Sequence, residues 1–161
     1  MQRLLNTKGK ILGVDFGDKR TGLAVCDVTR FLASGIGQIS VGGMQKTAER
    51  IREIIKEQNV TGGVVIGLPV NMNGSLGPRA EHAKKFASIL GGLLEADERT
   101  QGLPIVMVDE RMSTMVAARY LNETDTRGQK RKGVIDTLSA QIILQDALDT
   151  LKNLAKTVNK E

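Results

Sequence analysis

An acidic residue interrupts the first apolar run of the chain at a position where a buried strand would ordinarily carry an apolar side chain. Asp15 lies one residue before the end of the run Ile11–Phe16. An ionised carboxylate inside a sheet is costly unless it is paired or binds a cation. Two interpretations are open for Asp15. It either opens a turn by accepting hydrogen bonds from the amides of Gly17 and Asp18, or projects from a central strand into an active site.

Two further acids occupy comparable positions later in the chain. Glu110 follows the apolar run Leu103–Val108, directly after Asp109. Successive strand residues point to opposite faces, so only one of these two acids can readily share a site with Asp15, and we favour Glu110. Asp136 precedes Ala140 and Ile143 by four and seven residues, which places it on the apolar stripe of a helix. The alternative for Asp136, an acid favoured in a first turn by the helix dipole at about 0.3–1 kcal/mol, also stays open.

A site built from these acids would need a cation. Three converging carboxylates repel by about 4 kcal/mol per pair at roughly 4 Å and an effective dielectric of about 20. Oxygen ligands without histidine or cysteine suit Mg²⁺ or Mn²⁺ and disfavour zinc. With two such ions, the carboxylates would activate water and stabilise the leaving oxygen in phosphodiester hydrolysis. Basic residues within a few positions of the acids could hold the flanking phosphates: Lys19, Arg20, Arg111 and Lys132.

The pattern around the acids predicts an α/β fold with a mixed sheet. Two strands at Ile11–Phe16 and Gly22–Cys26 form a hairpin whose connector, residues 17–20, is expected to use φ > 0 at glycine. A third, irregular strand follows near Ile36–Val41, and parallel strands are expected at 62–66 and 103–108 through right-handed crossovers. Helices are predicted at 44–58, from residue 78 to about 94, from a cap at Ser113 or Thr114, and at about 134–151, with a mobile basic loop at 124–133.

This topology also predicts where the acids meet. Ligand sites in such sheets lie at the carboxyl ends of the parallel strands. Asp15, the loop 67–79 and Glu110 all fall at such ends. Their common location favours an active site over the turn-opening interpretation of Asp15.

Composition indicates one globular domain, residues 1–161, with an anionic partner. The net charge is +5 and aromatic residues make up 2% of the chain. Such a protein should bind the phosphate backbone of a nucleic acid and should not stack bases on aromatic side chains. No apolar run approaches a membrane span and the N-terminus lacks a signal-peptide core, so we expect a cytoplasmic protein that binds no membrane. The single cysteine, Cys26, is expected to be a buried small hydrophobe.

Four segments, spread from about Lys10 to Leu148, resemble the YqgF/RuvX family: DFGDKRTGLAV, VIGLPVNMNGS, VDERMST and KGVIDTLSAQIILQ. That family is known for Holliday junction resolvases and pre-16S rRNA nucleases with a ribonuclease H-like fold. The resemblance implies that Asp15, Glu110 and Asp136 bind metal. It also implies that further residues shape the site or contact substrate: Lys19, Arg20, Gly67-Leu68-Pro69, Asn71, Gly74 and Arg111. The chain departs from the family at Asn73, where an acid is common, and at Leu138 and Gln141, which replace small residues.

The expected function is that of a Mg²⁺- or Mn²⁺-dependent nuclease, with two ions, that processes the 5′ end of pre-16S rRNA in ribosome biogenesis. Cleavage of Holliday junctions is the alternative, because backbone recognition encodes no base preference. The protein would act as a monomer or a homodimer, and symmetric junction cleavage would require the dimer. A non-catalytic ribosome-assembly factor is a third possibility. An actin-like or sugar-kinase-like ATPase also begins with Asp-x-Gly in a hairpin, but it needs a second domain for which this chain has no room.

Overall fold

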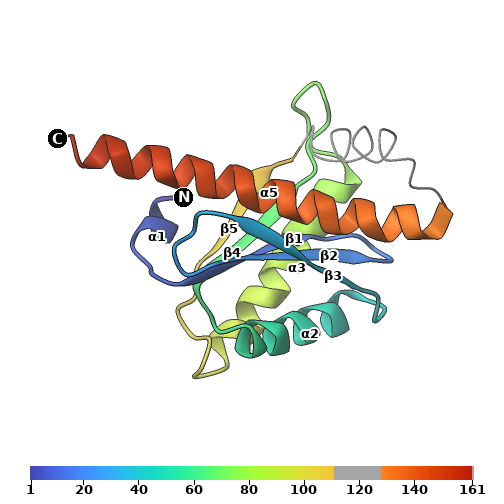
Figure 1. Cartoon of the computed structure of the whole chain (residues 1–161). Helices are drawn as coiled ribbons and strands as arrows, with labels where there is room; N and C mark the ends of the chain where they lie inside the picture. Colours follow the sequence, from blue (N-terminus) through green and yellow to red (C-terminus); the bar gives the residue numbers. More distant parts are fainter. Residues whose placement is uncertain (111–127, 161) are drawn as a thin grey trace.

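A five-stranded mixed sheet organises the structure, a computed structural model that describes residues 1–110 and 128–160, with side chains from 137 onward in the second part. The strand order is β3-β2-β1-β4-β5. β1 pairs antiparallel with β2 and parallel with β4, as the sequence predicts. Figure 1 shows the elements. Their bounds are α1 Gln2–Leu5, β1 Lys10–Asp15, β2 Thr21–Cys26, β3 Ala33–Ile39, α2 Met44–Glu57, β4 Val60–Leu68, α3 Pro78–Glu95, β5 Ile105–Asp109 and α5 Gly128–Val158.

Helices cover both faces of this sheet. The long helix α5 crosses one face, and α2 and α3 lie on the other (Figure 1). Alternation along β1 sends Leu12 and Val14 into the core under α2 and α3, and Ile11 into the core under α5. Each face therefore has its own apolar core. Because side chains alternate along a strand, neighbouring residues pack against helices on opposite faces.

The helix α5 sits close to the sheet because glycines lie beneath it. A Cβ on Gly13 would stand 2.7 Å from the Leu144 Cβ, and one on Gly35 would stand 2.5 Å from the Thr137 Cγ2. No real Cβ tolerates such distances, so only glycine lets α5 rest directly on β1 and β3. The helix is thereby fixed relative to the end of β1.

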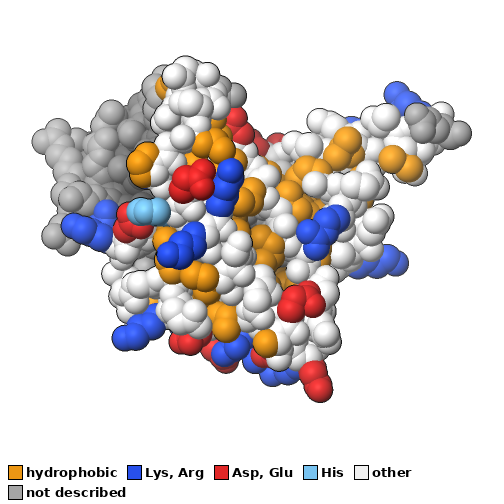
Figure 2. Space-filling model, turned by 180° about the vertical axis from the view of Figure 1, so that it is seen from behind, with side chains coloured by type: hydrophobic (Ala, Val, Ile, Leu, Met, Phe, Trp, Pro, Cys, Tyr) orange, Lys and Arg blue, Asp and Glu red, His pale blue; other side chains and the backbone are white. Residues whose placement is uncertain are grey.

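An aromatic stack holds the carboxyl end of β1 from the other side. Phe16 stacks on Phe86 of α3 with ring centroids 4.3 Å apart and planes within 7°. Such pairs stabilise by about 0.5–1.5 kcal/mol beyond their burial. Nearby, His82 Nδ1 lies 3.2 Å from Asp18 Oδ1 in the turn after β1. This histidine is half exposed, as expected for a surface residue, and Figure 2 shows it in pale blue.

Several sequence-based boundaries were wrong. The helix α5 begins at Gly128 and ends at Val158, so residues 128–133 of the expected basic loop are helical. Gln, Lys and Arg form helices well and no proline interrupts the segment, so a polar composition did not mark a loop here. β4 is longer than the predicted 62–66, and the short α1 was not predicted. The helix expected after Ser113 or Thr114 lies outside the described residues.

The turn between β1 and β2 also differs from the expectation. Gly17 does not adopt a positive φ. Its Cα instead lies against the carbonyl oxygen of Arg20, where a Cβ would collide with the backbone. Glycine is therefore required at this position for close approach and not for a left-handed conformation.

Cys26 is buried, as predicted, at 2% exposure in the core under α5. The backbone N–H of Ile11 donates a hydrogen bond to its Sγ at 3.1 Å. Burial raises the pKa of the Cys26 thiol. Among the helices in the described part of the chain, none is both long enough and apolar enough to cross a membrane.

Candidate active site

Asp15 ends β1 on the face that α5 covers. It shares this face with Gly13, which contacts α5. Its partner across the antiparallel pair is Gly22. On the other side β4 runs parallel to β1, with Ile66 paired to Val14, so Gly67 comes next, beside Asp15. Two glycines, at the paired positions of the neighbouring strands, thus flank the half-buried Asp15.

Glu110 reaches the same place from β5. It lies one residue beyond β5, where its backbone N–H donates to the Leu68 carbonyl at 3.2 Å, and its side chain is buried at 9% exposure. A Cβ on Gly67 would meet the Glu110 Oε2 at 2.6 Å and its Cδ at 2.8 Å. The Glu110 carboxylate therefore lies directly over Gly67. Because neighbouring strands are about 4.8 Å apart, this places the carboxylate one strand away from Asp15.

The two adjacent acids Asp109 and Glu110 point to opposite faces. Val106 and Val108 pack into the core under α5, and Glu110 continues this alternation. Ile105 and Met107 pack against the other core, and Asp109 follows them on that side. The geometry therefore pairs Asp15 with Glu110 and separates both from Asp109.

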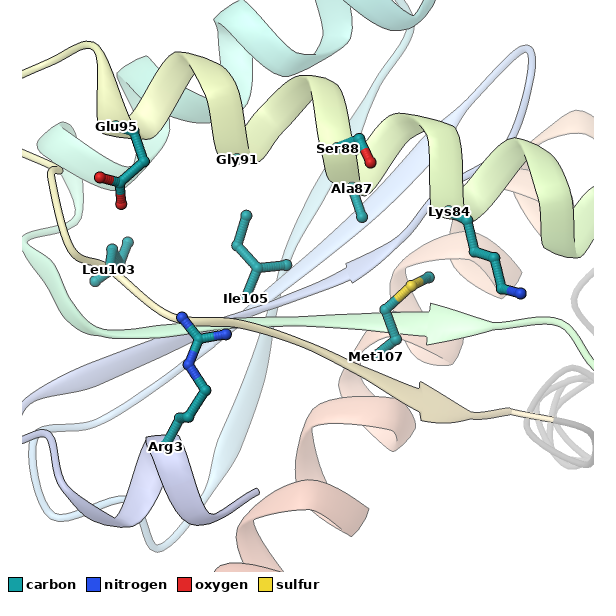
Figure 3. A pocket seen from close by; sticks show the side chains of 9 residues that line it. All are labelled: Arg3, Lys84, Ala87, Ser88, Gly91, Glu95, Leu103, Ile105 and Met107. Carbon is teal, nitrogen blue, oxygen red and sulfur yellow. The ribbon is translucent and has the colours of Figure 1, made fainter.

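A groove on the opposite face is distinct from these acids. It has a volume of about 500 Å³ and runs between α3 and β5. Figure 3 shows Ile105 and Met107 pointing from β5 toward α3, with Arg3 approaching from α1 and Lys84 at the other end. The sheet separates this groove from Asp15 and Glu110.

Asp136 is placed by its backbone alone. It lies in α5, four residues ahead of Ala140, whose carbonyl oxygen is 3.1 Å from the position of a Cβ on Gly13. Its side chain is outside the described residues. Across the side chains that the structure does describe, no three His, Cys, Asp or Glu residues form a group suited to a metal ion. The role of Asp136 as a third ligand stays a prediction.

The basic residues fall into two groups. Lys19 and Arg20 lie in the turn that follows Asp15, with Lys19 exposed and Arg20 half-buried. The Lys19 carbonyl accepts a hydrogen bond from the Ser40 hydroxyl at 2.9 Å, which ties this turn to the end of β3. Arg111 lies outside the described residues, and Lys132 is in α5 without a described side chain. The turn thus presents at least one exposed cation four residues after Asp15.

Asn71 belongs to a small hairpin after β4. Val70 bridges Leu76, and the Asn71 amide donates to the Ser75 hydroxyl at 3.0 Å. Gly74 turns this hairpin with φ +88°. The amide is used within the hairpin, so substrate contact by Asn71 stays a prediction.

Sequence reasoning did not single out two residues, one beside Asp15 and one in α5. Gly22 flanks Asp15, and the hairpin register of the two predicted strands was the signal that could have identified it. Ser139 lies three residues after Asp136 and is completely buried. A hydroxyl among the apolar residues of α5 was the only sequence signal.

The sheet order and the covering helix define a protein with a ribonuclease H-like fold. The solved structure of Thermus thermophilus RuvC superposes with a TM-score of 0.52 at 13% identity, covering 89% of this chain and 96% of RuvC. The yeast mitochondrial Holliday junction resolvase gives 0.50 at 12% identity, covering 98% of this chain and 89% of that protein. At these identities the likeness establishes the fold.

Sequence comparison identifies the family. The model described as "RuvX: Holliday junction resolvase" matches residues 9–150. A candidate pre-16S rRNA nuclease of Pelotomaculum thermopropionicum is 43% identical over 142 residues, 88% of this chain and 87% of that protein. One of Clostridioides difficile is 44% identical over 141 residues, 88% of this chain and 94% of that protein. The chain belongs to the RuvX family, a family of nucleases.

Proposed function

We propose that this protein is a metal-dependent nuclease that hydrolyses phosphodiester bonds in structured nucleic acid, with the precursor of 16S rRNA as its substrate. The observation that carries the proposal is the position of the Glu110 carboxylate, over Gly67 and one strand from Asp15. The names of the relatives support the choice of substrate.

The residues fit a hard divalent cation. Asp15 and Glu110 supply carboxylate oxygens, and the absence of a side chain at Gly67 is what lets the Glu110 carboxylate lie on this face of the sheet. Mg²⁺ and Mn²⁺ prefer such oxygen ligands. Asp136 is the proposed third ligand, and the three acids would hold two ions. When bound, such ions supply Lewis acidity and lower the pKa of a coordinated water.

The chain's own charges would position the substrate. Lys19 and Arg20, four and five residues after Asp15, would hold phosphates on either side of the scissile bond, together with Arg111 and Lys132. The net charge of +5 raises the local concentration of an anionic substrate. With 2% aromatic residues, recognition rests on backbone and shape.

A paired cleavage assay tests the function. Purified protein with Mg²⁺ or Mn²⁺ is given a 5′-extended 16S rRNA precursor and, in parallel, a four-way DNA junction. We expect cleavage of the RNA, abolished in Asp15→Asn. Symmetric cleavage of the junction alone would instead identify a resolvase, which must be a dimer. Tight binding of the RNA without cleavage under any metal condition would identify a non-catalytic assembly factor.

Thermal melts test the metal site independently of activity. If the acids share a metal site, the apo protein carries their mutual repulsion. Asp15→Asn should then be neutral or stabilising without metal, and should lose most of the stabilisation that millimolar Mn²⁺ gives the parent. Asp18→Asn, an exposed acid in the same turn, is the control and should respond to Mn²⁺ like the parent. A turn-opening role for Asp15 predicts the reverse: a loss of about 0.5–2 kcal/mol with and without metal, and an unchanged metal response.

A further inference from the structure

Ser139 carries a buried polar group that the fold does not use. Its side chain is fully buried in α5, and within the described structure its hydroxyl has no hydrogen-bond partner. A helical serine normally bonds to a carbonyl of the preceding turn or to water. Most buried hydroxyls in native proteins have a partner, so one without calls for an explanation.

The helical register places Ser139 on the flank of α5 that faces β4 and β5. Ser139 and Ile143 are four residues apart and therefore lie on the same side of the helix. The Ile143 Cδ1 is 2.7 Å from the position of a Cβ on Gly67, which the Glu110 Oε2 approaches to 2.6 Å. Ile143 and the Glu110 carboxylate are thus neighbours above the same glycine, and Ser139 is one turn away.

The direction of α5 brings Ser139 toward the site and not away from it. The later residues Leu148 and Leu151 share a core with Leu4, which precedes β1, and Ala140 lies over Gly13 near the end of β1. Preceding turns of α5 therefore approach the carboxyl ends of the strands, as Figure 1 shows. Ser139 lies between Ile143 and Asp136 on this path.

We propose that Ser139 is a positioning residue of the acidic site, an inference that rests on the proposed function. Because this hydroxyl makes no direct hydrogen bond within the described structure, it would donate to a water bound to the Glu110 carboxylate. That water would orient the carboxylate for the cation. A hydroxyl that supports a metal ligand in this way has a reason to be buried among apolar residues.

Mn²⁺ binding to the full chain, measured by calorimetry and by thermal melts, tests the role without relying on catalysis. Ser139→Ala should leave the apo protein folded, with an unchanged or higher melting temperature, and should weaken Mn²⁺ binding about tenfold or more. Ser139→Cys has a side chain of similar size but a weaker hydrogen-bond donor. Its affinity for Mn²⁺ should therefore fall between those of the parent and of Ser139→Ala. Ser88→Ala on α3, across the sheet, is the matched control and should bind Mn²⁺ like the parent.

The outcomes separate this inference from the proposed function. If the parent binds Mn²⁺ and Ser139→Ala binds it equally well, Ser139 only fills space and the positioning role is overturned. If the parent itself shows no response to Mn²⁺ or Mg²⁺, the metal-dependent function fails, and the role of Ser139 with it. A loss of affinity in Ser139→Ala that Ser88→Ala does not share supports both.

Discussion

Gly67 determines where the Glu110 carboxylate can lie. Any side chain at position 67 would occupy the space that now holds both that carboxylate and the Ile143 methyl group. In the sequence, the apolar part of β4 is followed by Gly67. The carboxylate of Glu110, which follows the neighbouring strand β5, lies over this glycine. A missing side chain is therefore part of the candidate site, as much as the acids themselves.

Gly67→Ala should disable the site and also cost some stability, because the new Cβ would stand 2.7 Å from the buried Ile143 Cδ1. The new Cβ would stand 2.6 Å from the Glu110 Oε2, so the flexible carboxylate must move. We expect the Mn²⁺-induced rise in melting temperature to fall sharply while the apo protein stays folded. Gly92→Ala is the control, because its Cβ would meet no atom within 4 Å. That variant should gain about 1 kcal/mol from helix propensity and keep the metal response. An unchanged metal response in Gly67→Ala would show that Glu110 is not a ligand.

At this scale the sequence correctly indicated that Asp15 and Glu110 lie at strand ends, but it did not indicate which residues surround them. Asp15 and Glu110 are identifiable because a charge at the end of an apolar run is rare and the period-two alternation of strands is reliable. The alternation also separates Glu110 from Asp109 once the register of β4 and β5 is known. Gly22 and Ser139 gave weaker signals, because the importance of each depends on which residues the fold brings opposite it.

At the scale of elements, α5 links the basic segment to the site. Residues 128–133 form its first turns and lead directly to Asp136. We expect the basic residues before Asp136 to guide a phosphate backbone toward the strand ends.

Replacing Lys130 and Arg131 by alanine should weaken RNA binding and leave the melting temperature almost unchanged. Alanine favours the helix, and the change removes two cations from the segment. Fluorescence anisotropy with the rRNA precursor measures the binding, and Lys46 and Arg50 on α2, both exposed, provide a double-alanine control of equal charge. If the two double variants bind the RNA with equal affinity, the loss of binding comes from net charge alone, and the segment 128–133 has no guiding role.

On the face of the sheet opposite α5, an ion pair joins α2 to the segment that follows α3. Lys56 Nζ lies against Asp97 Oδ2, and Asp97 also accepts a hydrogen bond from the Arg99 amide at 2.9 Å. The bond from Lys56 lowers the pKa of Asp97, with a smaller contribution from the Arg99 amide. An acid whose pKa is lowered by folding stabilises the protein above its ordinary value of 3.8.

Lys56→Met should therefore lower the melting temperature at neutral pH, and the difference from the parent should shrink as the pH falls through and below 3.8, where Asp97 becomes protonated. Melts of both proteins between pH 7 and pH 3 measure this. Lys46→Met removes an exposed charge from the same helix and serves as control. A difference that persists unchanged into acid would assign the effect to packing of the Lys56 stem.

Element types were largely predictable, and element ends were not. Apolar periodicity identified the amphipathic α2 and the buried face of α3 because those patterns reflect one-sided burial. The sequence at the start of α5 has no such pattern, because residues 128–133 are all polar or glycine. The sequence therefore indicated a loop at a segment whose polar residues form helix readily.

For the whole molecule, binding should depend strongly on salt. The net charge is +5 and aromatic residues are scarce, so phosphate contacts must supply most of the affinity. If about five phosphates are contacted, log K should fall against log salt with a slope of about −3.5 for single strands and −4.5 for duplex. Titrations of the RNA and the junction between about 50 and 200 mM salt provide both slopes. A slope near zero for both would point to recognition through apolar contacts.

Because Cys26 is buried, its rate of alkylation can report how often α5 separates from the sheet in the unmodified protein. This single thiol lies in the core between the sheet and α5, and its raised pKa keeps it protonated at neutral pH. An alkylating reagent must therefore wait until that layer opens, and the rate of modification measures how often the helix that carries Asp136 leaves the sheet. Cations bound by the acids would hold α5 against the sheet. Metal binding should therefore slow the alkylation of Cys26, which mass spectrometry can follow.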